Sequence, residues 1–228
     1  MHSHFNSEKM FTFLRGYANG KGMPETLHAL NYARKLHKGQ MRDGGEPYII
    51  HPLTMAFQAI SMGLNSDELI AAALLHDVVE DCGVEIENIP CNNRVKEIVL
   101  LLTFREPKTY KEKGGRGSSI ESLKEQYYNL ISRDAEASLV KLLDRCNNVS
   151  SMAGVFSEER LISYIEETKR YILPLIKRTK EEFPEYQNSL FILKYHIYSV
   201  LEAICCTINS LAGEQKVSVE DIIENEVI

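Results

Sequence analysis

One short segment of the chain concentrates residues that can bind a metal ion and move protons. Residues 71–81 read AAALLHDVVED, so His76 and Asp77 are adjacent, and Glu80 and Asp81 follow three and four residues after Asp77. We expect a single helix here, on which Asp77 and the acidic pair share one face. Carboxylates this close raise one another's pKa values unless a cation neutralises them. The pattern favours a divalent metal, although a hydrogen-bonded core histidine beside a solvated helix end explains it too.

Two further places in the sequence supply residues of the same kind. His51 precedes Pro52 at an expected helix start, a position from which a side chain can turn inward. The strongly apolar segment 138–148 contains polar residues at helical spacing, namely Lys141, Asp144, Arg145 and Asn148. A carboxylate buried on such a helix must be paired or must bind a metal. His51 and Asp144 are therefore candidates to join the doublet.

The elements that must position these residues are helices. Apolar residues recur every three or four positions over most of the chain, for example at Leu53, Ala56, Phe57, Ile60 and Leu64. No segment shows the alternation of period two that marks a strand. We predict an all-α fold, an irregular bundle of about eight to ten helices, in which Pro52 and Ser66 mark helix starts and Pro174 kinks or splits its helix.

Length and composition indicate an ordinary globular chain. The 228 residues suit one domain, and 44% hydrophobic and 25% charged residues exclude a disordered or low-complexity protein. The net charge of −6 argues against a general nucleic-acid binder, which must neutralise phosphates. We expect no membrane segment, because no apolar run reaches about 18 residues, and no secretion signal. The five cysteines form no C-x-x-C pair, which indicates reduced thiols and a cytoplasmic location.

Two glycine-containing segments, residues 39–50 and 105–118, are expected to be loops. The second has five basic and two acidic residues, which gives a local charge of +3 in an acidic chain. It is either a solvated connection or a lid that gathers phosphate groups.

Three sequence blocks in this order resemble the hydrolase part of the RelA/SpoT family, a branch of the HD-domain metal-dependent phosphohydrolases. They are HKGQMRDGGEPYIIHP at residues 37–52, AAALLHDVVED at 71–81 and LVKLLDRCNN at 139–148. A histidine–aspartate doublet alone is weak evidence, whereas the three ordered blocks, within a match over about residues 27–152, are specific. The resemblance implies one HD-type domain over residues 1–228, with a motif-bearing core at 24–152 and a helical extension at 157–228.

The resemblance also implies a role for each residue of the site. It implies a single divalent ion, with Mn²⁺ the expected metal and Fe, Ni or Zn also suited to mixed nitrogen and oxygen ligands. The implied metal ligands are His51, His76, Asp77 and Asp144. Glu80 and Asp81 are implied to orient and deprotonate the attacking water. The implied substrate-binding residues are Arg42 on the purine, Asn148 on the sugar, Lys141 as electrostatic support, and Ser151 at the rim.

The sequence also departs from the family pattern. Asp43-Gly44 stands where long members carry Lys-Ser after the arginine, which leaves the base preference open. Asn147, Ser150 and Ser151 replace a familiar His, Arg and Thr at the rim of the nucleotide pocket. Nothing after Met152 resembles the synthetase domain, and no G-x-x-x-x-G-K-[ST] loop occurs, so alarmone synthesis is not expected.

These features predict a stand-alone hydrolase that removes pyrophosphate from the 3′ position of guanosine 3′,5′-bis(diphosphate) and related alarmones, which are small anionic nucleotides. Two alternatives stay open. One is an HD phosphohydrolase for a different phosphorylated nucleotide, and the other is a nucleotide-binding module without turnover. The complete set of expected ligands and the acidic pair argue against the second alternative. The sequence does not indicate an oligomeric state or a role for the C-terminal helices.

Overall fold

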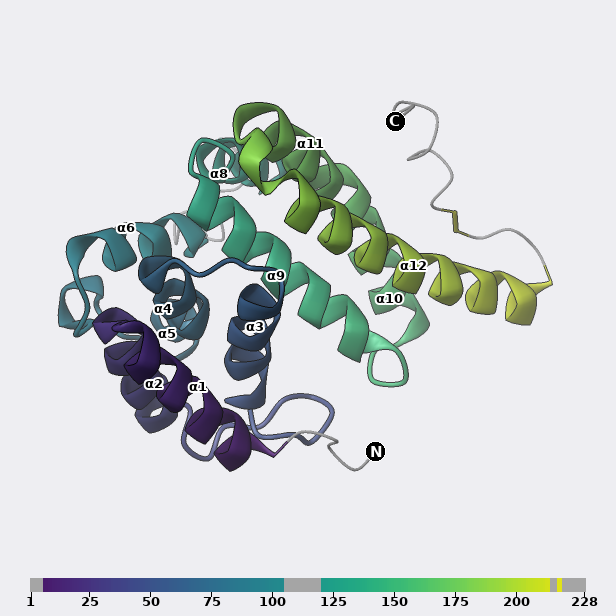
Figure 1. Cartoon of the computed structure of the whole chain (residues 1–228). Coiled ribbons are helices and arrows are strands. Elements are labelled where there is room, and N and C mark those ends of the chain that lie inside the picture. The colour runs from purple at the N-terminus through teal and green to yellow at the C-terminus, as the bar shows by residue number, and fades with distance from the viewer. Residues whose placement is uncertain (1–5, 105–119, 214–216, 219–228) are drawn as a thin grey trace, which may run out of the picture. The chain divides into compact units, whose positions relative to one another are not determined.

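A computed structural model of the chain describes residues 6–104, 120–213 and 217–218. Within these residues every regular element is helical, and the β-bridge between Met41 and Pro47 is isolated. The predicted all-α fold is therefore confirmed (Figure 1). The chain divides into two compact units, Met1–Lys141 and Leu142–Ile228. The expectation of one domain over residues 1–228 stays a prediction.

The first unit carries the sequence blocks at residues 37–52 and 71–81. Its α-helices are α1 (Ser7–Lys21), α2 (Pro24–Leu36), α3 (Ile50–Ser61), α4 (Asp67–Leu75), α5 (Val78–Asp81), α6 (Asn93–Leu102) and α8 (Ile120–Ile131), with a 3₁₀ turn at Ile86–Asn88. Helix α9 (Ala135–Met152) crosses the boundary, so its residues 135–141 belong to the first unit and 142–152 to the second.

Side-chain caps explain where several of these helices begin. Asn6, Ser66 and Asn92 each accept a hydrogen bond from the backbone N–H three residues later, at the starts of α1, α4 and α6. Such a cap satisfies an N–H group that has no partner inside the helix and stabilises the fold by about 1 kcal/mol. The predicted helix start at Ser66 is thus confirmed, and Pro52 lies in the first turn of α3 as expected.

Helix α4 is the centre of the first unit's core. All seven residues from Leu69 to Leu75 are buried, and α4 packs against α2, α3 and α6. Burial of a leucine or isoleucine side chain stabilises the folded state by about 1.5–3 kcal/mol. Because α4 is apolar on every side, these contacts fix it firmly. The doublet His76-Asp77 follows α4 directly and takes its position from this buried helix.

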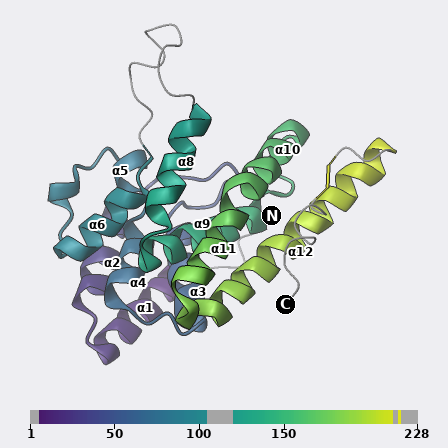
Figure 2. The ribbon, with the colours of Figure 1, turned by 90° about the horizontal axis from the view of Figure 1, so that it is seen from above.

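The second unit is built from the helices that follow α9. They are α10 (Glu158–Glu167), a π-helical turn (Thr168–Ile172), α11 (Leu173–Glu182), a 3₁₀ turn (Pro184–Tyr186) and α12 (Gln187–Ala212). Helices α11 and α12 pack side by side (Figure 2). Pro174 lies in the first turn of α11, directly after the π-helical turn. Proline lacks an N–H and cannot continue the hydrogen-bond ladder of a helix, which explains the change of helix type here. The predicted interruption at Pro174 is thus confirmed.

Arg145, part of the polar stripe on α9, has a structural role in the second unit. Its buried guanidinium pairs with Glu167, donates a hydrogen bond to Thr168 Oγ1 at 3.1 Å and lies 4.0 Å from the centroid of the Tyr164 ring. A buried charge requires such partners. Arg145 therefore holds α9 against α10 and the π-helical turn.

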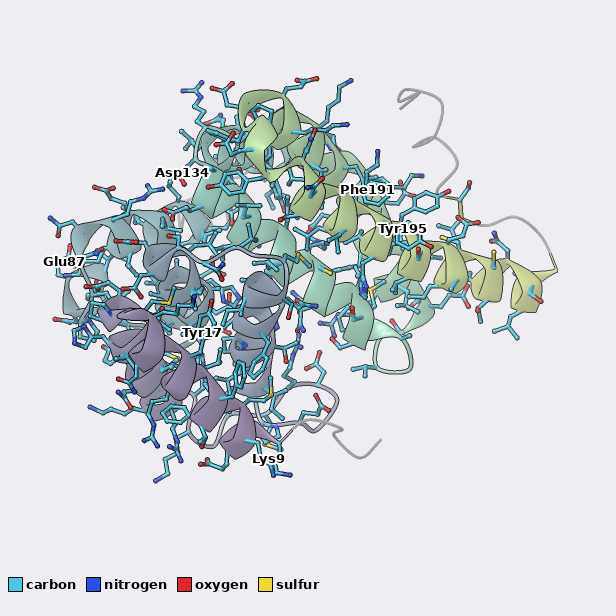
Figure 3. All side chains as sticks on the ribbon, in the orientation of Figure 1. Lys9, Tyr17, Glu87, Asp134, Phe191 and Tyr195 are labelled. Atoms are coloured by element: carbon cyan, nitrogen blue, oxygen red, sulfur yellow. The ribbon has the colours of Figure 1, made fainter. Side chains whose placement is uncertain are left out.

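Helix α12 exposes an apolar surface. Phe191 and Tyr195 are 68% and 66% exposed, and the centroids of their stacked rings lie 6.2 Å apart (Figure 3). By length and mean hydropathy, Pro184–Ala212 would be able to cross a membrane, and 28% of its most apolar window is buried. A helix of this length and hydropathy is weak evidence for a membrane span, since core helices of soluble proteins meet the same two criteria. The expected absence of a membrane segment therefore stays a prediction.

Candidate active site

The histidine–aspartate doublet lies in a break between two helices. Helix α4 ends at Leu75, His76 and Asp77 form a turn, and α5 begins at Val78. The segment is thus not the single helix that its pattern predicts. In a continuous helix, neighbouring side chains point about 100° apart. Here the backbone of Asp77, with φ −100° and ψ −4°, brings its Oδ2 within 2.7 Å of His76 Nε2, so two adjacent residues direct donor atoms at one point.

His51 reaches the same point from a different helix. It lies in the first turn of α3, and its Nε2 is 3.2 Å from His76 Nε2 and 3.8 Å from Asp77 Oδ2. The two histidines are buried, with 2% and 5% of their surface exposed. His76 Nδ1 donates a hydrogen bond to the Ala73 carbonyl oxygen at 2.9 Å, which orients the ring and leaves Nε2 as its lone-pair nitrogen. The structure thus brings three of the expected metal ligands together.

The separations of these donor atoms fit a divalent ion. Ligand bonds of Zn²⁺ and similar ions are about 2.0–2.2 Å long, so donors about 90–110° apart lie about 2.8–3.6 Å from each other. Of the observed separations, 3.2 Å lies within this interval, and 2.7 and 3.8 Å lie within about 0.2 Å of its two ends. Two imidazoles and a carboxylate also form a donor set that suits several divalent transition metals. His51, His76 and Asp77, which we call the metal cluster, are therefore a candidate metal site.

Three residues that the sequence reasoning did not single out support the metal cluster. The Tyr48 hydroxyl donates a hydrogen bond to Asp77 Oδ2. The Tyr48 ring stacks on His37 with centroids 4.7 Å apart, and His37 Nδ1 lies 2.6 Å from Gln40 Oε1. Burial and the negative charge of Asp77 raise the pKa of Tyr48 far above its usual value, so the hydroxyl keeps its proton. All three residues belong to the sequence block at 37–52. Their place in this block is the feature of the sequence that could have identified them.

Glu80 lies on α5, one turn after Asp77. Its Oε1 accepts a hydrogen bond from Phe104 N–H at 2.5 Å, and the Lys141 ammonium adds a positive charge nearby. The Glu80 residue as a whole is exposed, but neighbouring atoms remove water from its carboxylate. This desolvation raises the pKa of Glu80 and outweighs the lowering effects of Phe104 and Lys141. A carboxylate with a raised pKa is a better proton acceptor near neutral pH, so Glu80 can act as a general base.

The surroundings of the acidic pair leave room for a ligand. A pocket of about 360 Å³ is lined by Val79, Glu80, Gly83, Val84, Glu85, Thr103 and Phe104. Asp81 is exposed, and its carboxylate interacts with the Tyr48 hydroxyl. Lys141 Nζ lies 6.0 Å from the centroid of the Tyr127 ring. The first unit thus places the Glu80 carboxylate at the pocket with the Lys141 ammonium near it, and the Asp81 carboxylate at the Tyr48 hydroxyl.

Arg42 lies in a tight hairpin. Its N–H donates to Glu46 O, and Gly45 N–H donates to Arg42 O, both at 2.8 Å, which closes a β-turn with Asp43 and Gly44 at its tip. Gly45 has φ +81°, a left-handed conformation that favours glycine. The expected loop is thus an ordered turn, and the departure from the family pattern at Asp43-Gly44 lies at its exposed end.

Asp144, Asn148 and Ser151 lie on the part of α9 that belongs to the second unit. Asn148 Nδ2 donates to Asp144 Oδ1 at 2.6 Å, and Asp144 is 7% exposed. The Ser151 hydroxyl is exposed and hydrogen-bonds to the carbonyl oxygens of Asn147 and Asn148. The roles of these residues as fourth ligand and substrate contacts stay predictions. The basic segment at 105–118 lies outside the described residues, and both of its interpretations stay open.

Comparison with known proteins connects this site to a family. The family model for the HD domain matches residues 29–175. Over 159 residues, the chain is 35% identical to a guanosine-3′,5′-bis(diphosphate) 3′-pyrophosphohydrolase of Aquifex aeolicus. This match covers 68% of the chain and 21% of the relative. Over 148 residues, the chain is 32% identical to the protein of that name from Vibrio cholerae. This second match covers 64% of the chain and 20% of the relative. The chain thus spans about a fifth of the length of these curated relatives.

A solved structure has a similar fold. It belongs to a metazoan ortholog of SpoT that hydrolyzes ppGpp and plays a role in starvation responses. The TM-score is 0.53 at 21% sequence identity, and the match covers 71% of this chain and 95% of that chain. At this level of identity, the likeness shows a shared helical fold. Because the HD-domain match covers well over half of its residues, the chain belongs to the HD-domain family.

Proposed function

We propose that this chain is a metal-dependent phosphohydrolase that removes pyrophosphate from the 3′ position of guanosine 3′,5′-bis(diphosphate), ppGpp. The observation that carries the proposal is the convergence of His51, His76 and Asp77, whose donor atoms lie within 4.8 Å of one another. An acidic pair follows one helical turn later. Together they combine metal ligands with a proton acceptor, as metal-assisted phosphate ester hydrolysis requires. The names of the curated relatives point to ppGpp as the substrate.

We expect the metal cluster to hold one Mn²⁺ ion, with Asp144 as a fourth ligand. His51, His76 and Asp77 supply two neutral nitrogens and one anionic oxygen, a set that suits Mn²⁺. Asp144 is assigned from the sequence blocks, three residues after Lys141 on α9. When bound, the ion lowers the pKa of a water molecule and polarises a phosphoryl oxygen.

The chain's own residues supply proton transfer and charge stabilisation. Glu80 accepts a proton from the attacking water, and Asp81 orients that water. The water oxygen bonds to the phosphorus next to the 3′ oxygen, and the bond between this phosphorus and the 3′ oxygen breaks. The 3′ oxygen takes up a proton from solvent and Glu80 returns its proton to solvent, so the products are guanosine 5′-diphosphate and pyrophosphate. The Lys141 ammonium stabilises the negative charge that develops on the phosphoryl oxygens.

The nucleotide contacts that we expect are Arg42, Asn148 and Ser151. The Arg42 guanidinium can stack on any purine, so it supplies affinity without selecting a base. Asp43, at the exposed tip of the hairpin, offers a carboxylate that accepts hydrogen bonds from a base edge. Sites that hydrogen-bond one substituent reject analogues that lack it. The departure from the family pattern at Asp43-Gly44 is the observation behind a second candidate function, hydrolysis of another 3′-phosphorylated purine nucleotide.

The substrate class agrees with a reaction in the cytoplasm. All five cysteines carry free thiols, as the sequence predicts. A small anionic nucleotide is the partner that this reaction requires, and neither a nucleic acid nor a membrane takes part in it.

Incubation of the Mn²⁺-loaded protein with ppGpp tests the proposal. Mass spectrometry should identify guanosine 5′-diphosphate and pyrophosphate as products, and chelation of the metal should stop the reaction. His76→Ala and Asp144→Ala should each abolish turnover, because each removes an expected ligand of a single ion. His28→Ala, which removes an exposed histidine on α2, is the matched control and should stay active.

Two outcomes would change the proposal. Full activity in a folded His76→Ala variant would refute the metal cluster as the catalytic site. Faster turnover of the matched adenosine bis(diphosphate) than of ppGpp, in the same metal-dependent assay, would favour the second candidate function. Comparison of kcat/KM for the two nucleotides therefore decides between the candidates.

A further inference from the structure

Tyr48 connects two ligands that come from different helices. Its carbonyl oxygen accepts a hydrogen bond from His51 N–H at 2.9 Å, and its hydroxyl donates to Asp77 Oδ2. This carboxylate oxygen is the one that lies 2.7 Å from His76 Nε2. We propose that Tyr48 is a positioning residue that holds the Asp77 carboxylate in its metal-binding orientation, an inference that rests on the function proposed above.

The Tyr48 ring is itself fixed by its neighbours. One face stacks on His37, with ring centroids 4.7 Å apart and planes inclined by 26°. Tyr48 also makes an edge contact with His51, at 5.9 Å between centroids and 80° between planes. Its backbone N–H donates to Gln40 O at 2.9 Å. A ring constrained in this way has few rotamers available, so the hydroxyl is in place before an ion binds.

His37 provides a neutral stacking surface behind Tyr48. It is 3% exposed, and burial lowers its pKa. Its Nδ1 lies 2.6 Å from Gln40 Oε1, and because an amide oxygen only accepts hydrogen bonds, Nδ1 carries the proton. The Gln40 side chain thereby orients the His37 ring. His37 supports Tyr48 without adding positive charge that would oppose a cation in the metal cluster.

Asp77 requires such support because of its place in the chain. It lies in the turn between α4 and α5, and 23% of its side chain is exposed, whereas His51 and His76 are buried. A carboxylate at a turn can rotate away from the ligand position more freely than a packed imidazole. Loss of a hydrogen-bond partner of a metal ligand typically lowers metal affinity by about 10–100-fold. The Tyr48 hydroxyl should therefore contribute about tenfold or more to Mn²⁺ affinity.

Calorimetric titration of the metal-free, full-length protein with Mn²⁺ tests this role. Tyr48→Phe removes the hydroxyl and keeps both ring contacts, and it should weaken Mn²⁺ binding by about tenfold or more. Tyr17→Phe is the matched control, because the Tyr17 hydroxyl donates at 2.7 Å to Asn65 Oδ1 at an exposed site on α1. The control should bind Mn²⁺ as the unaltered protein does. The Mn²⁺-dependent rise in Tm provides a second measurement should the variant be less stable.

Kinetics separates a positioning role from general destabilisation. In Tyr48→Phe, the Mn²⁺ concentration for half-maximal ppGpp hydrolysis should rise by the factor found in the titration. At saturating Mn²⁺, the KM for ppGpp should return to within about twofold of the original value. Unchanged Mn²⁺ affinity in Tyr48→Phe, with affinity lost in His76→Ala, would overturn the role of Tyr48 and leave the proposed function intact. Unchanged affinity in both variants would overturn the metal cluster itself.

Discussion

Replacement of Glu80 by glutamine removes a charge and a proton acceptor while it preserves the shape of the side chain. The glutamine carbonyl oxygen can accept the hydrogen bond that Phe104 N–H donates to Glu80 Oε1 at 2.5 Å. Glu80 does not belong to the metal cluster, so Mn²⁺ binding should persist. A loss of activity in Glu80→Gln would therefore report on the chemical step rather than on folding or metal content.

We expect Glu80→Gln to lower kcat/KM by about 10²–10⁴-fold, the usual effect of losing a general base. This factor corresponds to about 3–5 kcal/mol in the activation barrier. The pH profile should change as well. Desolvation raises the pKa of Glu80, and a general base acts only when deprotonated, so the original rate should rise with pH above the usual glutamate range. The variant should lack this rise.

Initial rates of pyrophosphate release, measured from about pH 4.5 to pH 8 with the Mn²⁺ content of each sample, provide the assay. Glu85→Gln is the matched control, because Glu85 lines the same pocket and should tolerate the change. A Glu80→Gln enzyme that keeps the rise of rate with pH, or loses less than about threefold in kcat/KM, would refute the assignment of Glu80 as the base.

Three further changes test other parts of the molecule. Asp81→Asn should retain the ion while turnover falls by about a hundredfold or more, and loss of metal together with rate would make Asp81 a structural residue. Gly45→Ala places an alanine in a left-handed backbone conformation, at a cost of about 1–2 kcal/mol. The loosened hairpin should raise KM by about tenfold. Gly44→Ala is the control, because Gly44 has no positive φ, and it should leave KM unchanged. Burial would raise the pKa of Asp134, but hydrogen bonds from Arg94 outweigh it and hold this pKa below its usual value of about 4. The charged form of Asp134 therefore stabilises the fold above about pH 4, and this contribution is lost as pH falls through the lowered pKa. Asp134→Asn should lower the free energy of unfolding, measured by urea denaturation at pH 7, by about 1.5–3 kcal/mol. A difference in unfolding free energy between the two proteins that does not shrink toward acid pH would contradict this role of Asp134.

Features that depend on residues close together in the chain are predictable from the sequence. Apolar spacing gives the helices, because one buried face of a helix repeats every three or four residues. Ser66 predicts the start of α4, because its side chain caps an N–H three residues later, and Pro174 predicts the interruption before α11. The expected ligand types are likewise visible as histidines and carboxylates in ordered blocks.

Contacts between distant residues were decided by tertiary structure alone. His51 and His76 are 25 residues apart, and their Nε2 atoms meet at 3.2 Å because α3 packs against α4. Apolar spacing favours a continuous helix through the doublet, yet the chain turns at Asp77, whose carboxylate contacts Tyr48, 29 residues away. Periodicity reports only which face of a helix is buried, whereas the direction of a donor atom depends on which other elements that face meets.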